Sequence, residues 1–120
     1  MTNPGHSQKA SDPVTIELLY IDGCPGHEQI LPRLRELARQ RGARVVLRPV
    51  DTPEDAERER FLGSPTVRVD GRDVDPGAGA RTDYGLKCRI YRSDERGQSA
   101  VPPESWIRAA LDRADTRVGR

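Results

Sequence analysis

Three residues of this chain stand out as able to do covalent or metal chemistry: Cys24, Cys88 and His27. Cys24 lies between an apolar stretch, typical of a strand, and a segment with the apolar spacing of a helix. Pro25 suits the first position of that helix, so Cys24 is predicted at the N-cap. Its sulfur would then face unpaired N–H groups and the positive end of the helix dipole, which favours the thiolate. The position therefore predicts a reactive cysteine.

The alternative for Cys24 is a small, half-buried hydrophobic residue, which is the usual role of a single cysteine after a strand. The surrounding Gly23-Cys24-Pro25-Gly26 is too rich in turn residues for a core position, and this favours the reactive role. His27 follows one helical turn later, close enough to share a proton or a metal ion with Cys24. For His27 a solvated residue at the helix start is the favoured interpretation, with a catalytic or ligand role second.

The elements that position these residues begin with a strand over residues 14–21 and a helix over residues 25–41, followed by a strand over residues 44–50 that is buried at its centre. Gly42 is the expected residue after the end of the helix. A connection of this length predicts a right-handed βαβ unit with parallel strands.

A short polar helix is predicted next, capped by Thr52 and ended by Gly63. Val67 and Val69 then alternate with polar residues, and the hairpin signal Asp70-Gly71 follows, so strands three and four are predicted to be antiparallel. Residues 93–99 are predicted to form a charged turn. A last helix would pack on the core through Trp106, Ile107, Ala110 and Leu111.

The composition excludes several classes of protein. The 120 residues suffice for one domain, which we place at residues 14–115, between a disordered leader over 1–13 and a frayed tail over 116–120. Charged residues make up 32%, but the net charge is only +1, which argues against a nucleic-acid binder. No run approaches the roughly 20 apolar residues of a membrane span. We expect a cytoplasmic protein with no nucleic-acid or membrane partner.

The order β-α-β-α-β-β-α, the Cys24-Pro25-Gly26-His27 box and the later Gly63-Ser64-Pro65-Thr66 box resemble the thioredoxin-like superfamily. Pro32 stands eight residues after Cys24, where thioredoxins also carry a proline inside the helix. The resemblance implies an α/β fold with a mixed sheet of about four strands flanked by helices. It implies a cis bond before Pro65, and it makes Ser64, Pro65 and Thr66 the candidate residues for binding a thiol or peptide substrate.

One departure from that family concerns the second thiol. A dithiol oxidoreductase has Cys-x-x-Cys, whereas His27 stands here in place of the second cysteine. Cys88 lies in Gly85-Leu86-Lys87-Cys88-Arg89-Ile90-Tyr91, and with the two boxes this stretch resembles a group of small bacterial thioredoxin-like proteins, some labelled alkylmercury-lyase-like. Lys87 and Arg89 would favour the Cys88 thiolate if both pointed at it, but alternation along a strand would send them to the opposite face.

Two functions of different class follow. The first is a thiol–disulfide redox protein and candidate oxidoreductase. In it, Cys24 attacks a protein or small-molecule disulfide, and Cys88 or an external thiol resolves the intermediate. His27 is the third candidate catalytic residue. In the second, Cys24, Cys88 and His27 bind a soft metal ion or an organomercurial-type ligand. A third interpretation is a scaffold that only binds a partner through the edge at Pro65. Two thiolates and one imidazole do not fill a tetrahedral zinc site, so a structural zinc is not expected. We also expect no cofactor and assign no residue as a resident metal ligand.

Overall fold

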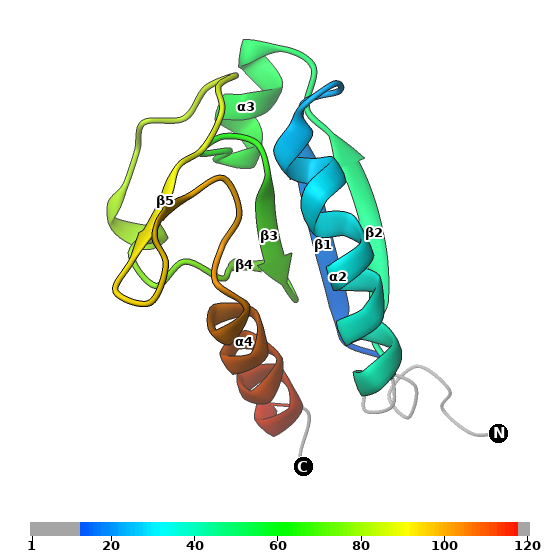
Figure 1. Ribbon diagram of the computed structural model, residues 1–120. Coiled ribbons are helices and arrows are strands. Elements are labelled where there is room, and N and C mark those ends of the chain that lie inside the picture. The colour runs from blue at the N-terminus through cyan, green and yellow to red at the C-terminus, as the bar shows by residue number, and fades with distance from the viewer. Residues whose placement is uncertain (1–12, 118–120) are drawn as a thin grey trace, which may run out of the picture.

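Figure 1 shows the fold of the chain in a computed structural model, which describes residues 13–117. Most of the leader predicted over residues 1–13 and the end of the tail predicted over residues 116–120 lie outside the described residues. The elements are β1 (Thr15–Tyr20), α2 (Pro25–Arg41), β2 (Arg44–Pro49), α3 (Pro53–Glu59), β3 (Thr66–Val69), β4 (Arg72–Asp73), η1 (Ala78–Ala80), β5 (Tyr91–Ser93), β6 (Gly97–Ser99) and α4 (Glu104–Arg117).

Four of the strands form one mixed sheet in the order β2-β1-β3-β4. β1 runs parallel to β2 and antiparallel to β3, and β3 pairs antiparallel with β4. The predicted βαβ unit and hairpin are therefore both confirmed. Asp70 and Gly71 have φ values of 49° and 87°, the left-handed backbone that a tight hairpin turn requires. The sheet and its helices have the predicted α/β, thioredoxin-like architecture.

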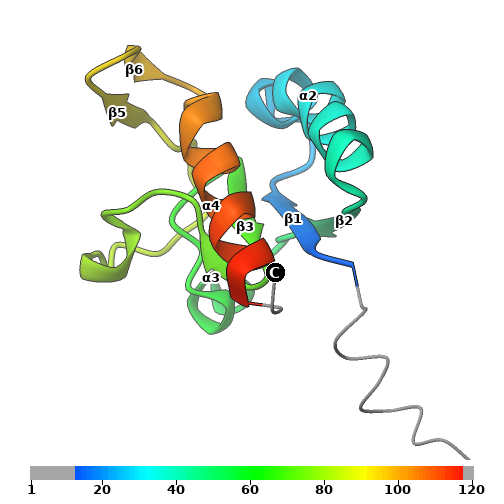
Figure 2. The same ribbon diagram turned by 90° about the horizontal axis from the view of Figure 1, so that it is seen from below.

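The helices cover both faces of the sheet, and Figure 2 shows α2 and α4 on one side with α3 on the other. Ile16 and Leu18 of β1 pack with the buried residues of α2 and α4. Leu19 faces the opposite way and forms a smaller cluster with Val50, Ala56 and Phe61. Because side chains alternate along a strand, β1 supplies both cores and is fixed between them.

Two of these elements differ from the prediction. β2 is an edge strand of the sheet, so its centre is only half-buried, and Leu47 is 39% exposed. Helix α3 is capped by Thr52, whose side chain accepts from the Asp55 N–H, but it ends at Arg60 and not at Gly63. Phe61, directly after Arg60, is fully buried, and the turn that carries its ring into the core ends the helix early.

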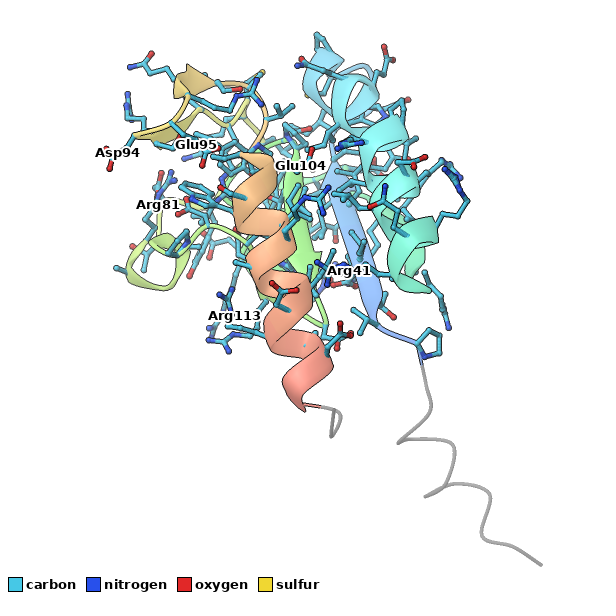
Figure 3. All side chains as sticks on the ribbon, turned by 60° about the horizontal axis from the view of Figure 1, so that its bottom comes forward. Arg41, Arg81, Asp94, Glu95, Glu104 and Arg113 are labelled. Carbon is cyan, nitrogen blue, oxygen red and sulfur yellow. The ribbon has the colours of Figure 1, made fainter. Side chains whose placement is uncertain are left out.

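Helix α4 buries Ile107, Ala110 and Leu111, as the sequence predicts. Ion pairs join it to α2, from Arg33 to Glu104 at 2.6 Å and from Arg41 to Asp112 at 2.9 Å. Figure 3 shows Glu104 and Arg41 on the side of α4 that faces α2. The charged turn predicted over residues 93–99 is present at residues 94–96, and β5 and β6 pair on either side of it as a two-stranded hairpin, which was not predicted. None of the helices within residues 13–117 is long and apolar enough to cross a membrane.

Candidate thiol site

Cys24 occupies the N-cap of α2, with φ −74° and ψ 122°, and Pro25 opens the helix. Its backbone N–H donates to the carbonyl of Ile21 at 3.1 Å, which closes the turn between β1 and α2. The Cys24 side chain makes no capping hydrogen bond and is 8% exposed. The sulfur therefore lies at the start of the helix, beside N–H groups that it does not itself cap and near the positive end of the helix dipole.

The turn at Ser64-Pro65, whose peptide bond is cis, lies against this helix end. A Cβ atom built on Gly26 would come within 2.9 Å of Pro65 Cδ, so only glycine allows this approach without a shift. On the other side, the hydroxyl of Ser64 accepts a hydrogen bond from the Ile21 N–H at 3.0 Å. The turn is thus held to residues on either side of Cys24.

His27 is turned onto the backbone of its own helix end. Its Nδ1 lies 2.9 Å from the carbonyl oxygen of Cys24, and because a carbonyl only accepts, Nδ1 carries the hydrogen. The ring stacks on Tyr20, with centroids 4.2 Å apart and planes 17° from parallel. His27 therefore stabilises the turn that carries Cys24, and Nε2 is the nitrogen left for proton transfer or for a ligand.

Cys88 lies beside the Ser64-Pro65 turn. Its backbone forms an isolated parallel bridge with Ser64. The Ser64 N–H donates to the Lys87 carbonyl at 2.8 Å, and the Arg89 N–H donates to the Ser64 carbonyl at 2.9 Å. Both cysteines are free thiols, Cys24 buried and Cys88 exposed.

Arg89 is the site's main feature that the sequence did not reveal. Its side chain is buried, donates to Thr66 Oγ1 at 3.0 Å, and forms ion pairs with Asp73 at 2.8 Å and Asp75 at 3.2 Å. Its guanidinium also lies 4.4 Å from the ring centroid of Tyr91. Among the described residues, its Nε is a buried polar atom with no hydrogen-bond partner. Arg89 therefore points inward, away from exposed Cys88, as strand alternation allows.

Thr66, the third candidate substrate residue, is fully buried. Its hydroxyl donates to the Gly63 carbonyl at 2.7 Å and accepts from Arg89. Thr66 thus links β3 to the Arg89 cluster, and its side chain is not presented to a ligand. A signal for this cluster existed in the sequence, since Asp73 and Asp75 are two apart and would point to one side of an extended segment.

A surface pocket of about 580 Å³ lies apart from both cysteines. Its lining includes Arg60, Asp75, Arg81 and Arg113. Figure 3 shows Arg81 and Arg113 on the opposite side of α4 from Arg41. Neither cysteine nor His27 lines this pocket, so the thiol site is a helix end and an adjoining turn. Within residues 13–117, no group of three or more His, Cys, Asp or Glu residues is arranged to hold a metal ion.

No protein-family model matches this sequence, and neither does any curated protein. Among solved structures, the chain is similar to the solution structure of oxidised thioredoxin from Plasmodium falciparum, with 18% identity, coverage of 95% of this chain and 93% of that one, and a TM-score of 0.44. The fold assignment rests on the strand order and helix packing described above.

Proposed function

We propose that the protein is a thiol–disulfide redox protein in which Cys24 is the reactive thiol and Cys88, or an external thiol, is the resolver. The observation that carries this proposal is that one turn contacts the segments of both cysteines. Pro65 lies against Gly26, two residues after Cys24, while Ser64 is paired with Cys88. Two thiols on segments held by the same turn can act in sequence on one disulfide.

The reaction follows ordinary thiol–disulfide exchange. The Cys24 thiolate attacks one sulfur of a disulfide R–S–S–R, forms the mixed disulfide Cys24–S–S–R and releases R–S⁻. The thiolate of Cys88, or of an external thiol, then attacks the Cys24 sulfur and releases the second R–S⁻. The protons of the two attacking thiols pass to the two released thiolates. The substrate disulfide is reduced and the attacking thiols are oxidised; an excess of a low-molecular-weight dithiol returns the protein to its starting state.

Alkylation by iodoacetamide tests the role of Cys24. In the Cys88→Ser protein only Cys24 can react, and in the Cys24→Ser protein only Cys88 can react. We expect Cys24 to react faster, although it is the buried thiol and Cys88 is the exposed one. In denaturant the two thiols should react alike, which controls for accessibility. Slow and equal reaction of both thiols in the folded protein would instead favour a scaffold that only binds a partner.

Binding of a soft metal ion by Cys24, Cys88 and His27 is the alternative function. Nδ1 of His27 is engaged by the Cys24 carbonyl, so only Nε2 could serve as the third ligand. Titration with Hg(II) followed by alkylation distinguishes the two functions. A binding module predicts protection of both thiols, and it predicts that His27→Ala weakens the complex. Affinity no greater than that of a free thiol would exclude the module.

A further inference from the structure

Residues 85–91, which we call the strap, lie along residues 61–65 beside the thiol site. The Gly85 N–H donates to the Phe61 carbonyl at 3.0 Å, and at the other end the Tyr91 hydroxyl donates to the Pro65 carbonyl at 2.6 Å. Between these contacts, both backbone groups of Ser64 are bonded to Lys87 and Arg89. The strap therefore occupies the backbone edge that the Ser64-Pro65 turn would otherwise expose.

The strap is anchored from within the protein. Arg89 and Tyr91 are 2% and 1% exposed, and Arg89 holds Asp73 and Asp75. Gly63 has φ +128°, and a Cβ atom there would meet Arg89 Cβ at 2.9 Å, so the strap approaches the turn as closely as glycine permits. Lifting the strap would separate a buried cation from its carboxylates, which is strongly unfavourable. The covered edge thus belongs to the stable fold.

The backbone N–H and carbonyl groups of Ile21 and Cys24 are also bonded within the chain. The Ile21 N–H and carbonyl are bonded to Ser64 Oγ and the Cys24 N–H, and the Cys24 carbonyl accepts from His27. A peptide that binds by strand addition needs a row of unpaired N–H and C=O groups. The first turn of α2, which follows Cys24, carries N–H groups that a helix start leaves without a partner in the helix, and such groups suit a small anionic group.

We propose that Cys24 acts on small disulfides that carry no extended peptide chain, because the strap takes the edge at which a peptide strand would bind. This inference rests on the proposed function of Cys24. Specificity then comes from Arg89 as a positioning residue, which holds the strap through its buried ion pairs. The chemical class of substrate is a low-molecular-weight disulfide, attacked at one sulfur with release of the other as a thiolate.

The test compares two probes on the Cys88→Ser protein, in which only Cys24 reacts. Both are mixed disulfides of 5-thio-2-nitrobenzoate, one with N-acetylcysteine amide and the other with a cysteine inside a short unstructured peptide, and release of the coloured thiolate is followed. We expect the peptide probe to react less than about tenfold faster than the N-acetylcysteine amide probe. A factor of about ten is roughly what one net backbone hydrogen bond supplies. A larger gain that disappears when the peptide N–H groups beside its cysteine are methylated would overturn the inference.

A variant with a weakened strap provides a second test of the inference. Arg89→Gln removes the ion pairs with Asp73 and Asp75, so the ratio of the peptide rate to the small-disulfide rate should rise. Arg92 is exposed, and Arg92→Gln is the matched control, which should leave this ratio unchanged. An unchanged ratio in a folded Arg89→Gln protein would contradict the role of Arg89. If the Arg89→Gln variant does not fold, the comparison of the peptide with its N-methylated form on the Cys88→Ser protein still tests the inference. The absolute rate of Cys24, compared with that of an unfolded cysteine peptide, tests the proposed function separately from this ratio.

Discussion

Gly26 and Pro65 lie so close that a Cβ atom on Gly26 would be 2.9 Å from Pro65 Cδ and 3.3 Å from the Ala100 carbonyl oxygen. This contact sets the spacing between the first turn of α2, which carries Cys24, and the turn that leads into β3. The spacing between the two turns therefore depends on residue 26 being glycine, with a hydrogen atom where alanine would have a methyl group.

Gly26→Ala should displace the turn and reduce the rate at which Cys24 is alkylated. The overpacking should cost about 1–3 kcal/mol, partly offset by the better helix propensity of alanine. Gly79→Ala is the control, because a Cβ atom there meets nothing within 4 Å. Urea unfolding and alkylation of both variants provide the comparison. A Gly26→Ala protein that is as stable and as reactive as the wild type would contradict the importance of this contact.

Arg89→Met should be among the most destabilising single substitutions in this chain. It leaves Asp73 and Asp75 without their buried cation, and breaking a buried ion pair in this way typically costs about 3–5 kcal/mol. Exposed Arg92→Met should change the free energy of unfolding by less than about 0.5 kcal/mol. Equal small effects in chemical denaturation would mean that the Arg89 cluster does not stabilise the fold.

Much of the fold could be predicted because its signals are local. Pro25 and Gly42 mark both ends of α2, Thr52 marks the start of α3, and Asp70-Gly71 marks the hairpin, and each of these positions agrees with the structure. Such residues act within one turn of the chain, so their effect does not depend on the rest of the fold.

The burial of Arg89 and the path of the strap could not be predicted in the same way. Arg89 stands in a charged stretch, and its burial depends on Asp73 and Asp75, which the fold brings to it from β4 and the loop after it. The early end of α3 likewise depends on the space in the core for Phe61, which outweighs the glycine stop signal at Gly63. Both outcomes follow from tertiary packing. The spacing of Asp73 and Asp75 indicates two carboxylates on one side of an extended segment, but it does not show which cation will pair with them.

The stability of the protein should fall as pH rises above about 10, in part through Tyr91. Burial raises the pKa of Tyr91 above its ordinary value of 10.0. Above that pH the unfolded chain releases this proton while the folded chain keeps it, so the free energy of unfolding decreases by up to about 1.4 kcal/mol per pH unit.

Tyr91→Phe separates this contribution from those of other groups. The variant should be about 1 kcal/mol less stable near neutral pH, because the Pro65 carbonyl loses the hydroxyl that donates to it. Its stability should then fall less steeply with alkaline pH than that of the wild type, as measured by urea unfolding at several pH values. Parallel pH profiles for the two proteins would show that Tyr91 ionises as readily in the folded chain as in the unfolded one.

Mild oxidation of the reduced protein should consume Cys24 and Cys88 together without forming a dimer, and dithiothreitol should restore both thiols. Closing the loop from residue 24 to residue 88 should stabilise the oxidised form by up to about 4 kcal/mol. Thiol counting, non-reducing gel electrophoresis and thermal unfolding measure these changes. A dimer linked through Cys24, with Cys88 still free, would favour an external thiol as the resolver.

The central claim is that Cys24 attacks the disulfide first and that Cys88 acts second. The most direct measurement is the amount of thiol that each cysteine variant releases from a small disulfide, together with mass spectrometry of the protein product. Cys88→Ser should release one half of the disulfide and retain the other on Cys24. The wild type should release both halves and end with Cys24 bonded to Cys88, while Cys24→Ser should show no fast release. Fast release by Cys24→Ser, with the adduct on Cys88, would contradict the account.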